Sequence, residues 1–303
     1  MEIIEIKGNT FCIDTGMTYI PFYKINNKEI IMFDSGWAEG QRKGIDDLLE
    51  KNNFKVMAII CSHAHIDHIG NNAYLKKKYS CIIAMPAYEA LICSSVVNLK
   101  LYYNSQTLLE VTEHFGHMVC DTDIMIFSNK NSITVCGIEF KIVHTPGHSP
   151  AHICIITPDD VAYLGDALIS YEVMRGAKMP YAYIFSEDFK SKLRLHDLKC
   201  SKYVVAHKGV YDDITELITD NINFYKSKAE GVYAVIDGAM TMEDIQKAVI
   251  ENFNIHVKSR YRYSIIERML VSYVEYLNET EALVLDMDKG FLKYQKSPKK
   301  ILS

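Results

Sequence analysis

The chain has 303 residues, of which 49% are apolar, and a formal net charge of −5 at pH 7. This length suggests one large domain or two smaller ones, and the apolar fraction is sufficient for an extensive core. The negative charge argues against a surface for nucleic acid or membrane, and the sequence has no run of about 18 apolar residues that would predict a membrane span.

The N-terminal residues predict no export signal, because Glu2 and Glu5 stand where such a signal carries basic residues. We therefore expect a cytoplasmic protein. Its eight cysteines are dispersed, without a Cys-x-x-Cys pair, which favours reduced thiols over a disulfide framework. Cys61, close to the first histidine motif, is interpreted as a core residue rather than a ligand.

The first third of the chain predicts short strands followed by strand–helix units. Strands are expected over 3–6, 10–13, 18–23 and 29–33, with a hairpin turn at Asn26-Asn27. A helix is expected over 41–52, and a buried strand over 56–60. This order indicates an α/β fold.

Directly after that buried strand, three histidines and an aspartate fall within the six residues His63-Ala64-His65-Ile66-Asp67-His68. The end of a buried strand is a usual place for reactive groups in α/β proteins, and His and Asp are common ligands of zinc. His63 and His65 can point the same way from an extended backbone. Asp67 and His68 lie where a helix over 71–79 begins. The motif therefore predicts one metal on the first pair and a second metal on the next pair.

Three later strand ends also carry potential ligands. The turn Thr145-Pro146-Gly147-His148-Ser149 follows a strand over 140–143 and presents His148 at its tip. The strand over 162–164 ends at Asp166, and the strand over 203–206 ends at His207. Ligands at four separate strand ends indicate one site assembled from several loops.

Other histidines near these motifs are interpreted differently. His144 and His152 flank His148 at four residues on each side, and spacing alone would allow either to be the ligand. Only His148 occupies the Pro-Gly tip, so we expect His152 to start the next strand and to support the site by hydrogen bonds. His114 and His117 are interpreted as ordinary residues at a helix end.

Two regions are candidates for substrate contacts. Between the first motif and His148, helices are expected over 87–93 and 105–114 with loops between them, and Tyr102 and Tyr103 could line a cleft there. After Asp166, a loop over 170–181 is expected to leave the sheet beside the metals. Its candidate substrate contacts are Tyr171, Arg175, Lys178 and Tyr181, and an exposed loop without contacts is the equal alternative.

The sequence of residues 231–303 predicts a separate helical module. A capping sequence at Thr241 to Asp244 begins one helix, a second helix is expected over 263–277, and Asp288-Lys289-Gly290 fits a hairpin turn between two strands. Two helices followed by a hairpin resemble a winged-helix module. Its 10 Lys and Arg residues balance its 10 Asp and Glu residues, whereas a DNA-reading module usually has a basic face. We therefore expect it to wall the active-site cleft or to form a homodimer contact.

The ordered motifs resemble those of the metallo-β-lactamase superfamily over about residues 1–210. The turn Phe33-Asp34-Ser35-Gly36 is similar to an early Asp-[Thr/Ser]-Gly turn of that family. The resemblance implies a four-layered αββα sandwich with two metals at one edge. It makes 1–230 the catalytic domain and 231–303 the C-terminal winged-helix-like module.

The same resemblance implies a set of seven metal ligands, and two further residues are interpreted as supports rather than ligands. His63, His65 and His148 would hold the first metal, Asp67, His68 and His207 the second, Asp166 would bridge them, and Asp34 and His152 would support them. The cofactors would be two divalent metal ions, zinc in the first place and iron or manganese otherwise. A metal-bridging hydroxide, positioned by Asp67 and Asp166, would be the nucleophile.

The implied activity is hydrolysis of a small ester, thioester or lactone, as in the glyoxalase II-like and lactonase-like branches. A metal-dependent phosphodiesterase or ribonuclease is the alternative, because two metals also suit phosphoryl transfer. The intact ligand set argues against a sulfur dioxygenase, and His65 argues against an oxygen-reducing diiron protein. β-Lactam hydrolysis is disfavoured because those enzymes are exported and their second ligand set differs. A DNA-binding regulator with a relict metal fold is the alternative from another class, and the ligand set and the neutral tail argue against it.

Overall fold

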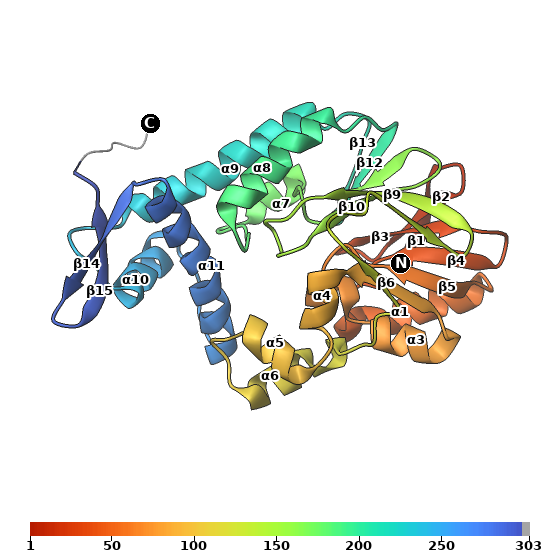
Figure 1. Cartoon of the computed structure of the whole chain (residues 1–303), viewed down its shortest axis with the longest axis horizontal. Helices are drawn as coiled ribbons and strands as arrows, with labels where there is room; N and C mark the ends of the chain where they lie inside the picture. The colour runs from red at the N-terminus through yellow and green to blue at the C-terminus, as the bar shows by residue number, and fades with distance from the viewer. Residues whose placement is uncertain (299–303) are drawn as a thin grey trace.

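The computed structural model describes residues 1–298, so the last five residues of the module expected over 231–303 lie outside it. Two β-sheets pack face to face, with helices on both outer faces (Figure 1). The first sheet contains, in spatial order, β1 (Glu2–Lys7), β2 (Thr10–Asp14), β3 (Tyr19–Lys24), β4 (Glu29–Phe33), β5 (Lys55–Ile60), β6 (Ile82–Pro86) and β7 (Ile124–Ile126). The second contains β13 (Gly209–Tyr211), β12 (Lys202–Val205), β11 (Val161–Tyr163), β10 (Ile153–Ile156), β9 (Ile138–His144) and β8 (Ser132–Val135). The αββα sandwich expected from the sequence is confirmed.

The direction of the strands brings the predicted ligand loops to one edge. In the first sheet β1 to β4 are antiparallel, whereas β4, β5, β6 and β7 run parallel. In the second sheet β11 and β12 are parallel within an otherwise antiparallel arrangement. Parallel strands release their carboxyl ends at the same edge, which is where ligands bind in open α/β sheets.

The core between the two sheets is aromatic and aliphatic. Phe33 at the end of β4 packs edge-on against Phe140 of β9, with ring centroids 5.4 Å apart. Ile60 of β5 and Tyr163 of β11 belong to the same buried cluster. Because both faces of β5 are covered, its sequence is a nearly continuous apolar run rather than an alternating one.

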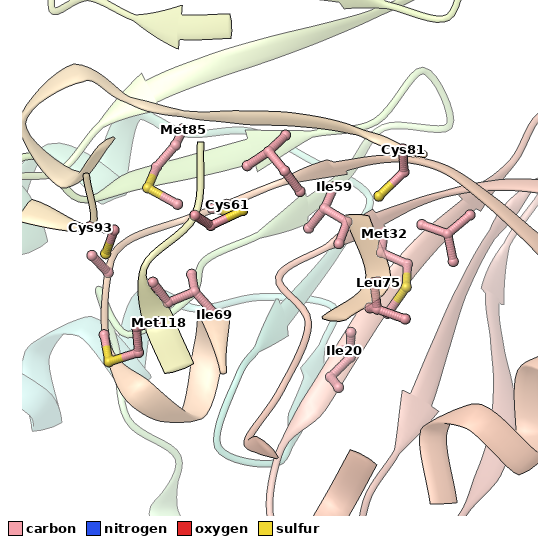
Figure 2. Close-up of a cluster of buried hydrophobic side chains, with 14 of the residues drawn as sticks. Ile20, Met32, Ile59, Cys61, Ile69, Leu75, Cys81, Met85, Cys93 and Met118 are labelled. Atoms are coloured by element: carbon pink, nitrogen blue, oxygen red, sulfur yellow. The ribbon is translucent and has the colours of Figure 1, made fainter. Parts of the chain in front are cut away.

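Helices cover the outer face of each sheet. On the first sheet, α1 (Ala38–Lys51) and α3 (Asn72–Tyr79) bury their apolar stripes, and Figure 2 shows Leu75 of α3 among Met32, Ile59 and Cys81. Beside the second sheet, α8 (Phe185–Arg194) and α9 (Thr215–Ala234) lie next to each other, and α9 continues beyond the sheet towards the C-terminal segment (Figure 1). Leu217 and Ile218 of α9 pack there against the outer residues of β11 and β12. The short helix α2 (Ile66–Ile69) lies inside the first histidine motif.

Two short helices stand where the sequence predicts loops. The insertion after β6 contains α4 (Ala87–Ile92) and α6 (Leu108–Phe115), as predicted, but α5 (Val96–Tyr102) replaces the expected loop between them. Ser95 caps α5 by accepting a hydrogen bond from the Asn98 amide at 3.1 Å. Likewise α7 (Tyr171–Gly176), capped by Ser170, replaces part of the loop expected over 170–181. A cap and one packed face stabilise helices too short to show a clear period.

The C-terminal segment has the expected helices and hairpin. The helix α10 (Met242–Asn252) begins with the predicted capping box of Thr241 and Asp244. It is followed by α11 (Arg260–Glu279) and by the hairpin of β14 (Leu283–Asp288) and β15 (Phe291–Lys296). The boundary expected at residue 230 falls inside α9, which continues to Ala234.

The C-terminal helices share one apolar cluster with the rest of the chain. It joins Phe185 of α8 and Tyr225 of α9 to Leu270, Tyr273 and Leu277 of α11. The hydroxyl of Tyr273 donates to the Pro180 carbonyl at 2.7 Å. These contacts fix α11 against the segment that precedes α8. No helix within residues 1–298 is both long and apolar enough to cross a membrane.

Candidate metal centre

Side chains from four strand ends meet at one edge of the sandwich. The structure brings these side chains together in two sets, and within each set the potential ligand atoms lie within 4.8 Å of one another. The first set is His63, His65, His148 and Asp166, and the second is Asp67, His68 and His207. These are the seven residues that the sequence motifs singled out. The loops after β5, β9, β11 and β12 supply them, so both sheets contribute.

Three imidazoles of the first set point nitrogen atoms at one place. His65 Nδ1 lies 2.9 Å from His63 Nε2 and 3.1 Å from His148 Nε2. The Pro-Gly turn allows His148 this position. Gly147 has φ of +131°, and a Cβ on it would lie 2.2 Å from the Cα of Asp188 in α8. Only glycine fits such a close approach at such a φ.

In His63 and His148, the outer ring nitrogen, which faces away from this meeting point, has a protein partner. His63 Nδ1 lies 3.0 Å from Ser62 Oγ, which itself donates to Asp34 at 2.7 Å and therefore accepts from the histidine. His148 Nδ1 donates to the Tyr181 carbonyl at 3.2 Å. With the outer nitrogens of these two residues protonated, their inner nitrogens carry lone pairs, which is the arrangement that a metal ligand requires.

Asp166 lies between the two sets. Its Oδ2 atom is 3.3 Å from His148 Nε2 of the first set and 3.4 Å from His207 Nε2 of the second. Its Oδ1 atom is 3.5 Å from His68 Nε2. Asp67 Oδ2 lies 3.3 Å from His207 Nε2 on the other side. One carboxylate can therefore serve both sets.

The residues fit a pair of divalent cations. His68 Nε2 and Asp166 Oδ1 are buried and have no hydrogen-bond partner among the described residues, and buried polar atoms without partners call for an explanation such as an ion. A set of imidazoles and carboxylates suits zinc and similar transition metals. His63, His65 and His148 would hold one ion, Asp67, His68 and His207 the other, and Asp166 would contact both.

Burial and neighbouring charges set the protonation of the two sets differently. Burial, reinforced by the nearby His68, lowers the pKa of His63 well below its usual value. Burial would also lower the pKa of His207, but the Asp166 and Asp67 carboxylates outweigh burial and raise that pKa to about 10. The same carboxylates raise the pKa of His68 against the effect of burial. Without metal, the second set therefore holds protons at neutral pH.

We expect zinc binding to release protons and to strengthen as the pH rises towards 10, where His207 loses its proton. The sign follows because a raised pKa keeps the imidazole protonated, and a protonated imidazole cannot be a ligand. Titration calorimetry of metal-stripped protein, in two buffers with different ionisation enthalpies, measures the protons released. Binding heats at pH 7 that do not depend on the buffer would contradict this protonation state.

Asp34 supports the second set and links the two sheets. It has a left-handed backbone with φ of 64° at the end of β4. Its carboxylate accepts hydrogen bonds from His68 Nδ1 at 2.8 Å, from the Ser62 amide at 2.7 Å and from the Tyr163 hydroxyl at 2.7 Å. The bond from Nδ1 leaves the Nε2 atom of His68 facing Asp166. His152 also supports a candidate ligand, because the backbone amide of Asp166 donates to His152 Nε2 at 3.1 Å.

Glu89 is a buried supporting residue that none of the sequence motifs indicates. Its carboxylate accepts hydrogen bonds from the Ala64 amide at 3.0 Å, from Ser149 Oγ at 2.6 Å and from the Ala151 amide at 2.8 Å. It thereby ties the loop of His65 to the loop of His148. The available signal was a single acid in the apolar segment AYEALI of α4.

A small cavity opens beside the two sets. Its volume is about 200 Å³, and its lining includes His65, Asp67, Tyr181 and Arg268. Four further lining residues, Tyr261, Ser264, Ile265 and Met269, belong like Arg268 to α11. The C-terminal segment therefore forms one wall of this cavity, in agreement with the role expected for it as a wall of the cleft.

The candidate substrate contacts lie in different places. The ring of Tyr181 lies 5.6 Å from those of both His65 and His148, and its hydroxyl is buried without a partner. Tyr171 donates a hydrogen bond to Asp220 at 3.0 Å on the surface. Arg175 and Lys178 are exposed and do not line the cavity beside the ligands.

The remaining histidines stay outside both sets. His144 Nε2 donates to the Lys130 carbonyl at 2.8 Å. His114 lies beside Gln106 and the ring of Tyr261. Neither residue, nor His117, belongs to the sets of potential ligands found in residues 1–298.

Comparisons with known proteins agree with this site. Residues 4–94 and 128–207 match the model of the metallo-beta-lactamase superfamily. An uncharacterised protein of Aquifex aeolicus is 30% identical over 196 residues, which are 64% of this chain and 76% of that protein. A hydroxyacylglutathione hydrolase of Rhodopseudomonas palustris is 30% identical over 123 residues. These residues make up 40% of this chain and 38% of that relative.

Solved structures show the same fold. The crystal structure of a metallo-beta-lactamase family protein from Thermus thermophilus superposes with a TM-score of 0.68 at 16% identity, covering 92% of this chain and 93% of that one. A beta-lactamase domain protein from Burkholderia ambifaria gives a TM-score of 0.69 at 12% identity, with 98% and 94% covered. The family match covers more than half of the chain and includes all seven ligand positions. The chain belongs to the metallo-beta-lactamase superfamily.

Proposed function

We propose that this metallohydrolase uses two divalent metal ions to cleave a small ester, thioester or lactone. The observation that carries the proposal is the pairing of two ligand sets, joined by Asp166, with a cavity of about 200 Å³ that opens directly onto His65 and Asp67. The partial likeness to hydroxyacylglutathione hydrolases supports an acyl substrate. The size of the cavity favours a small molecule over a polymer.

The chemistry divides between the ions and the chain. Two bound ions would polarise a carbonyl oxygen and lower the pKa of a water molecule towards about 7. The Asp67 and Asp166 carboxylates, both beside His207 Nε2, would accept hydrogen bonds from the attacking water and orient it. The buried hydroxyl of Tyr181, which has no partner among the described residues, would donate to an oxygen of the substrate. α11 would exclude bulk water from that side of the cavity.

A substrate panel tests this proposal. Thioesters, lactones, simple esters and phosphodiesters are offered to protein reconstituted with zinc, manganese or iron, and initial rates are measured with and without a chelator. We expect turnover of acyl substrates, loss of that turnover with the chelator and recovery when metal is added back. Turnover confined to phosphodiesters, or equal rates after chelation, would reject the proposed reaction.

A further inference from the structure

The side chain of Arg268 has an unusual environment in the wall of the cavity. Its guanidinium carbon lies 3.9 Å from the ring centre of Tyr102, 4.7 Å from that of Tyr103 and 5.3 Å from that of Tyr181. A guanidinium over aromatic faces is a favourable contact. These rings hold the group in place, but they carry no negative charge to balance it.

The charge of Arg268 has no counter-ion in the described part of the chain. Its Nη2 atom is buried and lacks a hydrogen-bond partner. Arg260 on the same helix, in contrast, pairs with Glu110 at 3.0 Å. A shielded cation without an anionic partner is costly. A protein retains such a group most readily where a ligand supplies the missing charge.

The location of Arg268 connects this charge to the metal ligands. Tyr102, which stacks on the guanidinium, has its hydroxyl 3.2 Å from His65 Nε2. Arg268 lines the small cavity together with His65 and Asp67, and it also borders a groove of about 870 Å³ that runs past Tyr102 and Tyr183. Arg268 therefore lines both spaces. The lining of the groove also contains Glu267, Glu275 and Glu279, so the small cavity beside His65 is the space that suits an anion.

We propose that Arg268, held by Tyr102, Tyr103 and Tyr181, binds an oxyanion of the substrate. The preferred substrate is then an ester or thioester that carries a carboxylate or phosphate a few bonds from the scissile carbonyl. The planar guanidinium can donate two parallel hydrogen bonds to such a group. This inference rests on the proposed ester hydrolysis and specifies its substrate class. Arg268 acts as a specificity residue supplied by α11.

Matched esters test the preference for an anion. With the carboxylate on the acyl side, 4-nitrophenyl hemisuccinate is compared with neutral 4-nitrophenyl 4-methylpentanoate. With the carboxylate on the leaving group, 4-acetoxybenzoate is compared with 4-isopropylphenyl acetate. We expect the wild type to have a KM about 10- to 100-fold lower for at least one anionic ester than for its neutral partner, as a charged hydrogen-bonded pair predicts. Arg268→Met should remove that advantage, so that the ratio of KM values within each ester pair approaches one.

Arg262→Met is the control, because it removes an exposed positive charge from the first turns of the same helix. It should keep the preference. Arg268→Lys covers the case in which Arg268→Met does not fold. This variant keeps the charge but not the planar fork, and it should lose several-fold of the preference. Either an equal preference in Arg268→Lys and the wild type, or no anionic advantage in the wild type, overturns the proposal.

Thermal melting separates this inference from the proposed reaction. Acetate and inorganic phosphate should each be tested for a rise in the melting temperature of the wild type, since a ligand that binds the folded state stabilises it. The rise should be absent in Arg268→Met and present in Arg262→Met, and the more effective anion identifies the preferred group. A rise without turnover of any ester would reject the hydrolysis alone. Turnover with no rise from either anion would reject the anion site alone.

Discussion

Replacing His148 by Ala is expected to abolish turnover while the protein stays folded. The change removes one of the three imidazole nitrogens that converge on the first site. Metal assistance contributes several kcal/mol to such reactions, so its loss corresponds to about a thousandfold or more in rate. The apolar clusters of the core do not contain His148, so the melting temperature of the metal-free variant should stay close to that of the metal-free wild type.

His144→Ala is the matched control for this experiment. His144 lies four residues away at the end of β9, and its ring contacts the Lys130 carbonyl rather than the ligands. Its activity and metal content should match the wild type, whereas Asp67→Ala should behave like His148→Ala. Rates on any accepted substrate and metal content by elemental analysis are the measurements. Full activity in His148→Ala would show that the convergence of the three imidazoles is not used in catalysis.

Ending the chain after Lys228 is expected to leave little soluble protein. The cut removes α10 and α11, whose residues cover Phe185 and Tyr225 in the shared cluster. Exposure of each large apolar side chain costs about 1.5–3 kcal/mol, and a whole domain is stable by only about 5–15 kcal/mol. Soluble yield, size-exclusion chromatography and thermal melting measure the effect.

A shorter deletion, ending at Thr280, distinguishes the helices from the hairpin. It removes β14 and β15, in which Met287 and Phe291 are exposed and Leu283 is buried. The loss of stability should therefore be smaller, and the wall formed by α11 should remain. If the protein ending at Lys228 stays soluble and works at the wild-type rate, the C-terminal segment is an independent appendage after all.

The sequence predicted those elements whose pattern is local. The alternating and apolar runs placed β1 to β5, and the capping box placed the start of α10. The sequence pattern does not predict the short helices α5 and α7, because their stability comes from a cap and from packing. The strand β7, only three residues long, exists because β6 offers it an edge to pair with, and nothing in its own residues specifies that partner.

The same distinction holds at the metal centre. All seven candidate ligands could be found because histidine and aspartate recur at strand ends, where their chemistry is visible in the sequence. Glu89 and Arg268 could not be found in this way. Glu89 bonds to residues 25 and 62 positions away, and Arg268 stacks on a tyrosine of α5. Their importance depends on distances that only the folded chain establishes.

Each ligand set takes residues from both sheets. The loop after β5 of the first sheet supplies His63, His65, Asp67 and His68, while the second sheet supplies His148, Asp166 and His207. Neither half of the sandwich alone can therefore form either site. If the chain were divided between the sheets and the two fragments were produced separately, we expect binding of divalent metal to return only on their reassembly. The metal centre could then report complementation between the fragments directly, without any added label.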